Sequence, residues 1–467
     1  MSLFGRLPIY TDYEFIDETN IVDVLTNSLN IHLTNQNDIN YLYNYYKGQQ
    51  PILNRKKDIR PDINNKVVEN RAYEIVSFKV GYLMGQPIQY VKRSADYEDS
   101  AINELNDEMY LENKAVKDKK LVWWSTICGT SYRMTLPNPN EDDEEAPFNI
   151  YTLDPRNTFV VYWTGLGNKP VMSCNIVQRN TGEIEYYCYT DNMFYLIVGT
   201  TIMKAVHTIE RAEPHLLGYN PITEYPANFA RLGAFEIVLD MLNAINTVSS
   251  NRVDGIEQFV QALLVFIGAD IDDEKFKSLR EYGGIKIPDG ADIKYLVQEL
   301  NQEQSQTLVD YMYQTVLTIC GMPNRNGGTS TSDTGVAVHI RDGWEAAENR
   351  AKDAEGLFIM AEKEFLKVVR RISSVYGRND FKLSAVDVRF TRRNYENILE
   401  KSQVLTTMLD NENVHPLLAF EHCGMFVDPQ SAYDLSEEWK RIAVQRQQSE
   451  LNALTGVEEP KEVEVNV

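Results

Sequence analysis

Residues 324–335 read NRNGGTSTSDTG, and the longest helical pattern of the chain follows them. From Trp344 onward, apolar and small residues recur alternately three and four positions apart, at Ala347, Ala351, Ala354, Phe358, Ala361, Phe365, Val368 and Ile372. This spacing marks one stripe along an α-helix. We predict a helix from about 334 to 376, roughly 60 Å long at about 1.5 Å per residue. A polar loop on so long a helix indicates a part held out in open space.

The charge balance is strongly acidic. Lys and Arg number 46 against 68 Asp and Glu, which gives a formal net charge of −22. Tight DNA binding normally uses a basic patch that neutralises phosphates. The charge balance therefore argues against a protein that binds DNA tightly. It leaves open a surface along which DNA passes with little affinity. Acidity that serves solubility alone is equally compatible with these numbers.

The cysteines and the apolar segments indicate in which cellular compartment the chain is made. The five cysteines stand far apart, with no CxxC pair, at Cys128, Cys174, Cys188, Cys320 and Cys423. This pattern argues against a disulfide framework or a zinc site and favours a reducing compartment. The first residues hold no long apolar segment of the secretory kind. The most apolar stretch, 263–267, is far too short to span a membrane, so we expect a soluble chain made inside a cell.

The first half of the chain alternates between helical and strand patterns. We expect residues 1–40 to form a polar arm with one short helix. Residues 41–93 carry a helical pattern that is broken at Pro61 and ended by Gly85 and Pro87, with a strand at 88–91, and 96–127 is again helical. Between 129 and 231 the pattern becomes β-rich, with hairpin turns expected at 180–182 and 191–192. The expected strands are 149–153, 158–162, 171–178, 184–190 and 194–200. Together they predict an antiparallel sheet.

The second half predicts a stalk with a tip. Two helical patterns, 232–266 and 301–320, enclose a small α/β insert at 268–300. Inside the insert we expect a short helix near 273–282 and strands at 285–287 and 293–297. The C-terminal third predicts helices at about 394–409, 412–422 and 430–453, and then an acidic tail that we expect to be disordered.

No catalytic pattern stands out in the sequence. The six histidines form no HExxH, and there is no GxSxG. The glycine-rich loop lacks the lysine of GxxxxGK[ST], which excludes a nucleotide site there. The carboxylates Asp270, Asp272, Asp273 and Glu274 suit either a divalent ion or the cap of a short helix, and we favour the cap. We predict a protein that is not an enzyme and that carries no cofactor or metal.

Four separated segments resemble one known family, and they occur in the family's order. They are 70–90 (NRAYEIVSFKVGYLMGQPIQY), 225–268, 332–337 (SDTGVA) and 390–438. The chain resembles the portal proteins of tailed bacteriophages, of the kind found in siphophages of Gram-positive hosts. The resemblance implies a mixed α+β, mainly α portal fold with a wing, a two-helix stem, a small α/β clip, a tunnel loop, a long wing helix and a helical crown.

Carried over segment by segment, the resemblance divides the chain. It implies an N-terminal arm (1–40), a wing (41–231), stem helices (232–267 and 301–321), a clip (268–300), a tunnel loop (322–334), a long wing helix with a return strand (335–393), a crown (394–453) and a disordered acidic tail (454–467). The loop residues implied to face DNA are Pro323, Asn324, Arg325, Asn326, Gly327, Gly328, Thr329 and Ser330. The clip residues implied to contact the motor or an adaptor are Asp272, Asp273, Lys275, Lys277, Arg280, Lys286 and Asp289.

The resemblance also implies an assembly and its partners. It implies a homo-oligomeric ring of about twelve subunits at one capsid vertex. Double-stranded DNA would be packaged and later ejected through the ring, without sequence specificity. The implied protein partners are the terminase large subunit, head-completion or adaptor proteins, and the major capsid and scaffolding proteins, with no membrane. The chain would reside in the virion, and in the host cytoplasm during assembly.

Two other functions stay open at this point. A helical adaptor or scaffold of virion assembly, which forms no conduit, would share the acidity and the long helices. A metal-dependent nuclease would use scattered carboxylates such as Asp272 and Asp273. Arg325, the one cation between 323 and 330, fits either a brush against the DNA backbone or a salt bridge to a neighbouring subunit.

Overall fold

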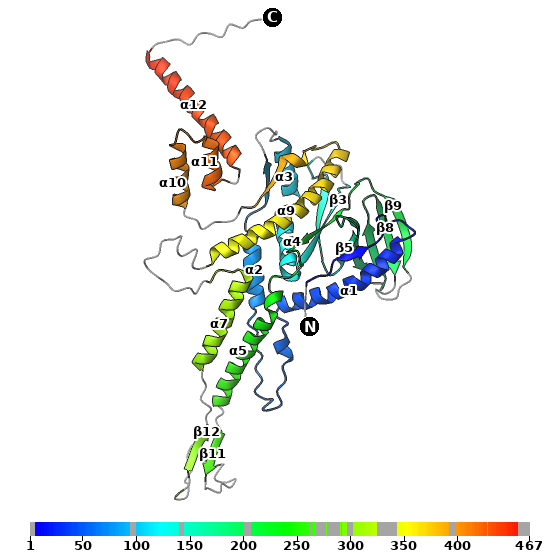
Figure 1. Cartoon of the computed structure of the whole chain (residues 1–467), viewed down its shortest axis with the longest axis vertical. Helices are drawn as coiled ribbons and strands as arrows, with labels where there is room; N and C mark the ends of the chain where they lie inside the picture. Colours follow the sequence, from blue (N-terminus) through cyan, green and yellow to red (C-terminus); the bar gives the residue numbers. More distant parts are fainter. Residues whose placement is uncertain are drawn as a thin grey trace.

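The structure is a computed structural model of the whole chain. It describes residues 5–93, 100–139, 144–199, 207–260, 263–267, 277, 290, 292–296, 302–324, 343–391, 398–426 and 428–455. The molecule is elongated: an α+β body carries two long helices that project to one side, and a group of C-terminal helices lies toward the opposite end (Figure 1). With 51% helix and 19% strand, the predicted mixed α+β, mainly α fold class is confirmed.

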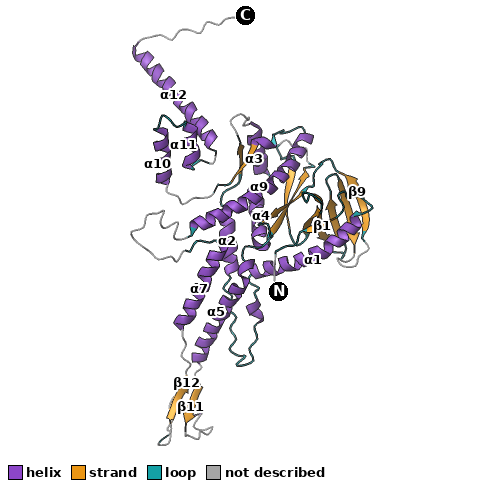
Figure 2. Ribbon diagram, in the orientation of Figure 1, coloured by secondary structure: helices purple, strands orange, loops and turns teal. Residues whose placement is uncertain are grey.

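The larger sheet of the body has six strands (Figure 2). Their order across the sheet is β1 (Ile9–Thr11), β5 (Thr158–Trp163), β6 (Pro170–Gln178), β7 (Ile184–Tyr189), β8 (Met193–Gly199) and β9 (Thr208–Pro214). β1 runs parallel to β5, and the other neighbours are antiparallel. Helix α1 (Ile21–Tyr46) packs Leu25 and Leu29 against sheet residues such as Phe159 and Tyr186. Four of the five predicted strands are confirmed as β5 to β8, antiparallel neighbours in this sheet, within one residue of the bounds observed. The fifth, expected at 149–153, is β4 (Phe148–Leu153) and belongs to a second sheet, so the prediction of one sheet was wrong.

A second sheet sits under the long helix. It comprises β10 (Ile222–Pro226), β3 (Thr130–Pro137) and β4 (Phe148–Leu153), and it contacts α9 (Trp344–Val375) on one side. Around it lie α2 (Arg71–Leu83), α3 (Ser100–Leu111), α4 (Lys114–Cys128) and the strand pair β2 (Gln89–Lys92) and β13 (Val386–Arg389). Gly129 ends α4 at φ +85, and a Cβ there would stand 1.9 Å from the Arg231 carbonyl oxygen. The helix and the chain after β10 therefore meet where no side chain fits.

Two helices and a two-stranded antiparallel sheet form the projecting part. We call α5 (Leu239–Val260) and α7 (Gln302–Cys320) the stem. At its far end β11 (Leu263–Ile267) pairs antiparallel with β12 (Asp292–Leu296). The C-terminal helices are α10 (Ile398–Leu409), α11 (Pro416–Cys423) and α12 (Pro429–Thr455). Short 3-10 turns occur at Pro51–Asn54, Glu236–Val238 and Leu383–Ala385.

Three sequence-based element predictions were wrong. The N-terminal region is no arm with one short helix, because α1 runs unbroken across residue 40 and buries one face, despite its many asparagines. The first stem helix ends at Val260 and not at 266, because the β-branched and aromatic run Leu263–Ile267 forms a strand instead. The long helix does not run unbroken from 334, because Gly343, directly before the first residue of α9, adopts a left-handed φ of +81.

Some predictions lie outside the described residues. They include the helix expected near 273–282, apart from Lys277, the strand at 285–287, the start of the long helix at 334–342 and the tail beyond 455. The predicted strand at 293–297 is confirmed as β12, one residue earlier. The three predicted C-terminal helices are confirmed with small shifts at their ends.

Candidate functional site: the stem and its anchorage

A long segment between α1 and α2 runs down the stem and back. We call residues 47–70 the strap. Its two limbs lie beside α5 on the side away from α7 (Figure 1). On α5 it meets a polar stripe at Asn246, Ser250 and Asp254, four residues apart and therefore on one helix face. The hydrogen bonds of these three side chains hold the strap against the middle of α5.

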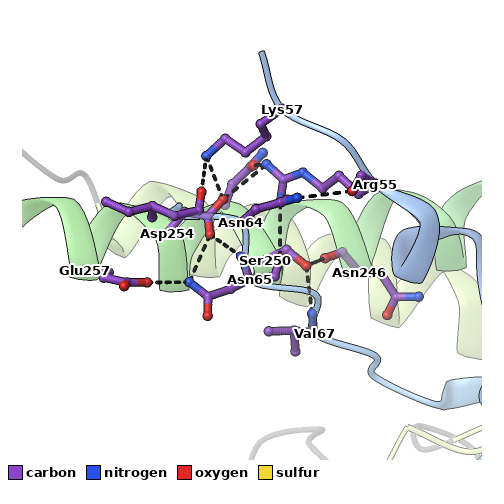
Figure 3. Close-up of polar contacts among 11 residues, drawn as sticks. Arg55, Lys57, Asn64, Asn65, Val67, Asn246, Ser250, Asp254 and Glu257 are labelled. Atoms are coloured by element: carbon purple, nitrogen blue, oxygen red, sulfur yellow. Dashed lines mark hydrogen bonds and ion pairs between the residues drawn. The ribbon is translucent and has the colours of Figure 1, made fainter. Parts of the chain in front are cut away.

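Asp254 is the centre of this contact (Figure 3). Its side chain is 4% exposed and lies between the two limbs of the strap. One carboxylate oxygen accepts a hydrogen bond from Lys57 Nζ at 2.9 Å and lies 3.2 Å from Arg55 Nη2. The other oxygen accepts from the backbone N–H and the side-chain amide of Asn65, at 2.7 and 3.0 Å. Burial acts to raise the pKa of Asp254, but the hydrogen bonds from Lys57 and Asn65 outweigh it and lower the pKa below its usual value.

Further hydrogen bonds tie the returning limb along α5 (Figure 3). The backbone N–H of Val67 donates to Ser250 Oγ at 3.0 Å, and that of Glu69 donates to Asn246 Oδ1 at 2.8 Å. The amide of Asn65 also donates to Glu257 Oε2 at 2.8 Å. The stem helix thus supplies acceptors for a strap that has no sheet or helix to satisfy its own backbone there.

The second stem helix, α7, contacts both α5 and α2. Arg252, two residues from Ser250 and hence on another face of α5, donates to Gln306 of α7 at 2.6 Å. Nearer the body, the hydroxyl of Tyr313 donates to Glu74 of α2 at 2.7 Å, and the Arg71 guanidinium lies 4.1 Å from the Tyr313 ring centroid. The body therefore fixes each stem helix separately, α5 through the strap and α7 through α2.

Both stem helices also carry exposed apolar side chains. The exposed fractions are 40% and 52% for Val253 and Ile256 on α5, and 49% and 66% for Leu308 and Tyr311 on α7. Each pair is three residues apart, so its two side chains lie on one face of their helix and are available for contact with another protein.

The long helix α9 is anchored by an ion cluster inside the body. The fully buried carboxylate of Glu362 contacts Lys114 Nζ at 2.8 Å and Arg133 Nη1 at 2.9 Å, and it accepts hydrogen bonds from the hydroxyls of Tyr90 and Tyr225 at 2.5 and 2.8 Å. Asp118 pairs with the same two cations. Two cations and two carboxylates balance, so the cluster is neutral as a whole.

The protonation state of this cluster follows from its partners. Burial acts to raise the pKa of Glu362, but Lys114 and Arg133 outweigh it and lower the pKa to about 2. Burial acts to lower the pKa of Arg133, but contacts with Tyr225, Glu362 and Asp118 raise it further above its usual value. Glu362 and Arg133 are therefore both charged at neutral pH. The cluster joins α4, β3 and α9 in the interior.

The structure describes few of the residues that the sequence pointed to. Pro323 is buried and Asn324 half-buried directly after α7, while Arg325, Asn326, Gly327, Gly328, Thr329 and Ser330 lie outside the described residues. Lys277 is exposed, and Asp272, Asp273, Lys275, Arg280, Lys286 and Asp289 lie outside. The roles of the tunnel loop and the clip therefore stay predictions.

Sequence reasoning missed the strap and the Glu362 cluster. The strap signal was faint, because its partners on α5 are nearly 190 positions away, as between Asn65 and Asp254. Glu362 offered a clearer signal: it lies four residues after Phe358 and three before Phe365, in the stripe of the long helix. A charged residue at a core position usually needs a buried partner.

Two searches of the described residues bear on metals and membranes. Within them no three His, Cys, Asp or Glu side chains are grouped as metal ligands would be. The carboxylates 270–274 are not among these residues. None of the described helices combines the length and apolarity that crossing a membrane requires.

The projecting stem is fixed to the body and bears exposed apolar side chains, as a subunit of a structural assembly would. The chain belongs to the family of phage portal proteins: the family described as "Phage portal protein, SPP1 Gp6-like" matches residues 25–450. The recognition made from the sequence is thereby confirmed. The family is one of structural assembly proteins.

Solved structures with a similar arrangement come from gene transfer agent particles. A chain of "Virion of native gene transfer agent (GTA) particle" shares 11% identity with a TM-score of 0.45, over 84% of this chain and 94% of that chain. A chain of "Neck of empty GTA particle computed with C6 symmetry" shares 12% identity with a TM-score of 0.43, over 76% and 90%. No curated protein matches. The assignment rests on the family match and not on these likenesses.

Proposed function

We propose that this chain assembles into a closed ring of about twelve copies at one capsid vertex. Double-stranded DNA passes through the ring during packaging and again during ejection. Membership of the portal family over residues 25–450 is the observation that carries this proposal. The virion is then the site of action, and the host cytoplasm the site of assembly.

The stem supports assembly into a ring. Val253, Ile256, Leu308 and Tyr311 are exposed in the single subunit. A neighbouring stem in a ring would cover them and gain roughly 25 cal/mol for each Å² of apolar surface removed from water. The strap and the contacts of α7 with α2 hold both stem helices to the body, so that each subunit presents the same preformed surface.

The charge supports passage of DNA rather than capture. A chain with a net charge of −22 repels phosphates, and a ring of such chains multiplies that charge. We therefore expect weak contact with DNA, made to its backbone and without sequence specificity. The tunnel-loop residues, Arg325 among them, are the proposed contacts.

The proposed docking site is the far end of the stem. The terminase motor, and later the head-completion or adaptor proteins, would bind the clip residues around Lys277, which is exposed. Hydrolysis of ATP would belong to the motor. Capsid and scaffolding proteins are the proposed partners of the body.

Negative-stain electron microscopy combined with native mass spectrometry tests the ring. We expect closed particles with a central opening and a mass of about twelve subunits. Solitary subunits or dimers at every concentration would contradict the proposal and favour the adaptor that forms no conduit. Substitution Arg325→Glu in a packaging assay tests the DNA contact, and unchanged packaging would remove that contact.

A further inference from the structure

A cavity of about 170 Å³ lies where the body, the stem and the long helix meet. Its walls come from α2, α4, the chain after β10, the body end of the stem and α9. The polar or charged groups that matter below are Lys79 on α2, Ser125 and Thr126 on α4, Asn228, and Arg350 on α9. A water molecule takes about 30 Å³ in the liquid, so the cavity is large enough for a small polyatomic ion.

The lining is cationic in an acidic protein. The chain has 68 carboxylate residues against 46 Lys and Arg, yet none of the residues that line this cavity is Asp or Glu. Among the described residues, neither Lys79 nor Arg350 has a carboxylate within ion-pair distance. Glu348, two residues before Arg350 on α9, accepts a hydrogen bond from Tyr82 at 2.8 Å and lies 3.9 Å from Lys352. Two positive charges thus face one space without a counter-charge.

The groups in the cavity are placed to receive negative charge. Within the described residues the ammonium of Lys79 makes no hydrogen bond. The hydroxyls of Ser125 and Thr126 both donate to the Val122 carbonyl, and the Asn228 amide donates to Leu232. The side-chain donors that remain are the second N–H of the Asn228 amide, the ammonium of Lys79 and the guanidinium of Arg350, which donates one N–H to the Ile319 carbonyl.

The backbone of the stem makes room for Arg350. Gly321 follows α7 with φ +63, and a Cβ there would stand 2.3 Å from Arg350 Cδ. The Arg350 side chain therefore packs against the end of the stem in space that a side chain at position 321 would occupy. Burial lowers the pKa of Lys79, and the nearby charge of Arg350 lowers it too, against an opposite influence of Cys320. An unpaired, partly buried ammonium is costly unless a counter-ion joins it.

We propose that this cavity binds a small oxyanion, a phosphate or a carboxylate group, held between Lys79 and Arg350. The bound anion ties α2, the end of the stem and α9 to one another. The same chemistry has two sources: a free phosphate ion, or an acidic side chain of a second copy of this chain. The second source rests on the proposed ring, whereas the first does not.

Thermal unfolding of the dilute, unassembled chain tests the free anion. Inorganic phosphate is titrated against sodium chloride of equal ionic strength, for the natural chain and for Lys79→Met, Lys79→Arg, Arg350→Met and Lys352→Met. We expect phosphate to raise the melting temperature, with an apparent Kd that rises at least about tenfold in Lys79→Met and Arg350→Met. Lys79→Arg keeps the charge and the effect. Lys352→Met is the matched control, since Lys352 is 62% exposed on the same helix and should respond as the natural chain does.

Assembly tests the second source. If phosphate has no effect on the natural chain, we expect Lys79→Met and Arg350→Met to need at least about tenfold more protein to form rings, with Lys79→Arg and Lys352→Met unaffected. The proposal is overturned if phosphate stabilises all variants equally, or if it stabilises none and all variants assemble alike. Absence of rings from the natural chain would instead count against the proposed function and leave the phosphate titration as the test of the cavity.

Discussion

Two ion clusters hold the two long parts of this molecule, and they differ in their access to water. Glu362 ties the long helix to the body with every charged side chain 5% exposed or less. Asp254 ties the strap to the stem, and its carboxylate is equally buried, but its partners Arg55 and Lys57 are 17% and 21% exposed. Both clusters pair carboxylates with Lys and Arg, but only the cluster at the strap has partners that water reaches.

That difference decides what each cluster does. Charges that are shielded from water interact strongly, and removal of one leaves a buried charge without its partner. The Glu362 cluster therefore keeps α9 in one position. At the strap, water can replace a lost partner, and each contact contributes little beyond the hydrogen bonds that accompany it. We infer that the body is built as a fixed frame, and that the strap is the attachment that can loosen.

The largest expected effect is at the buried cluster. Glu362→Gln leaves Lys114 and Arg133 with Asp118 as their remaining carboxylate, and we expect a loss of about 3–5 kcal/mol in the free energy of unfolding. Urea denaturation, followed by a spectroscopic signal from the body, measures this free energy. The control is Glu364→Gln, whose 56% exposed side chain pairs with Lys367 at 2.6 Å, and for which we expect less than about 1 kcal/mol. Equal losses in the two variants would remove the contrast between buried and exposed pairs.

Acid should weaken the same cluster. The pKa of Glu362 is lowered to about 2 from 4.5, so its contribution is fully present above pH 4.5 and is lost as pH falls toward 2. At about 1.4 kcal/mol per pKa unit, the loss reaches up to about 3 kcal/mol. Urea midpoints measured from pH 6 to pH 2 check this. The slope should flatten in Glu362→Gln, and an unchanged slope would assign the acid sensitivity to other carboxylates.

How far the sequence predicts the structure depends on the distance between partners. Strands β4 to β8 and the C-terminal helices were predictable because their periodicity is local, and the long helix was predictable from Trp344 onward. Helix α1 was missed because its many asparagines were interpreted as a polar arm. Leu25 and Leu29, four residues apart on its buried face, were the signal for a helix. Leu263 continued the helical spacing of α5, yet the apolar run to Ile267 forms a strand.

The site was less predictable than the fold. Lys79 and Arg350 stand 271 positions apart in the sequence, and nothing local marks either as a cavity residue. The polar stripe on α5 was visible at Ser250, but its partners in the strap were not, since Val67 offers only a backbone N–H. Contacts that depend on backbone groups or on long sequence separation leave no pattern in a single sequence.

A smaller effect is expected at the strap. Asp254→Asn removes the charge that faces Arg55 and Lys57, and we expect a loss of about 1–3 kcal/mol, confined to the strap. Hydrogen exchange should quicken in residues 55–67 and stay unchanged in the second sheet. The matched control is Asp240→Asn, an exposed aspartate on the same helix. Faster exchange throughout the body would show that the strap and the frame unfold together, against the contrast drawn here.

The smallest expected effect distinguishes the ion pair of Asp254 with Lys57 from its hydrogen bonds with Asn65. Lys57 Nζ contacts the carboxylate at 2.9 Å and the Ile63 carbonyl at 2.9 Å, yet its side chain is 21% exposed. Lys57→Met should therefore cost only about 0.2–1 kcal/mol, because water takes over both contacts, and Lys56→Met, at an exposed neighbour, should cost less still. Exchange rates in the strap measure both variants. If Lys57→Met loosens the strap as much as Asp254→Asn, the ion pair is the main attachment; if it does not, the hydrogen bonds from Asn65 hold the strap to the stem.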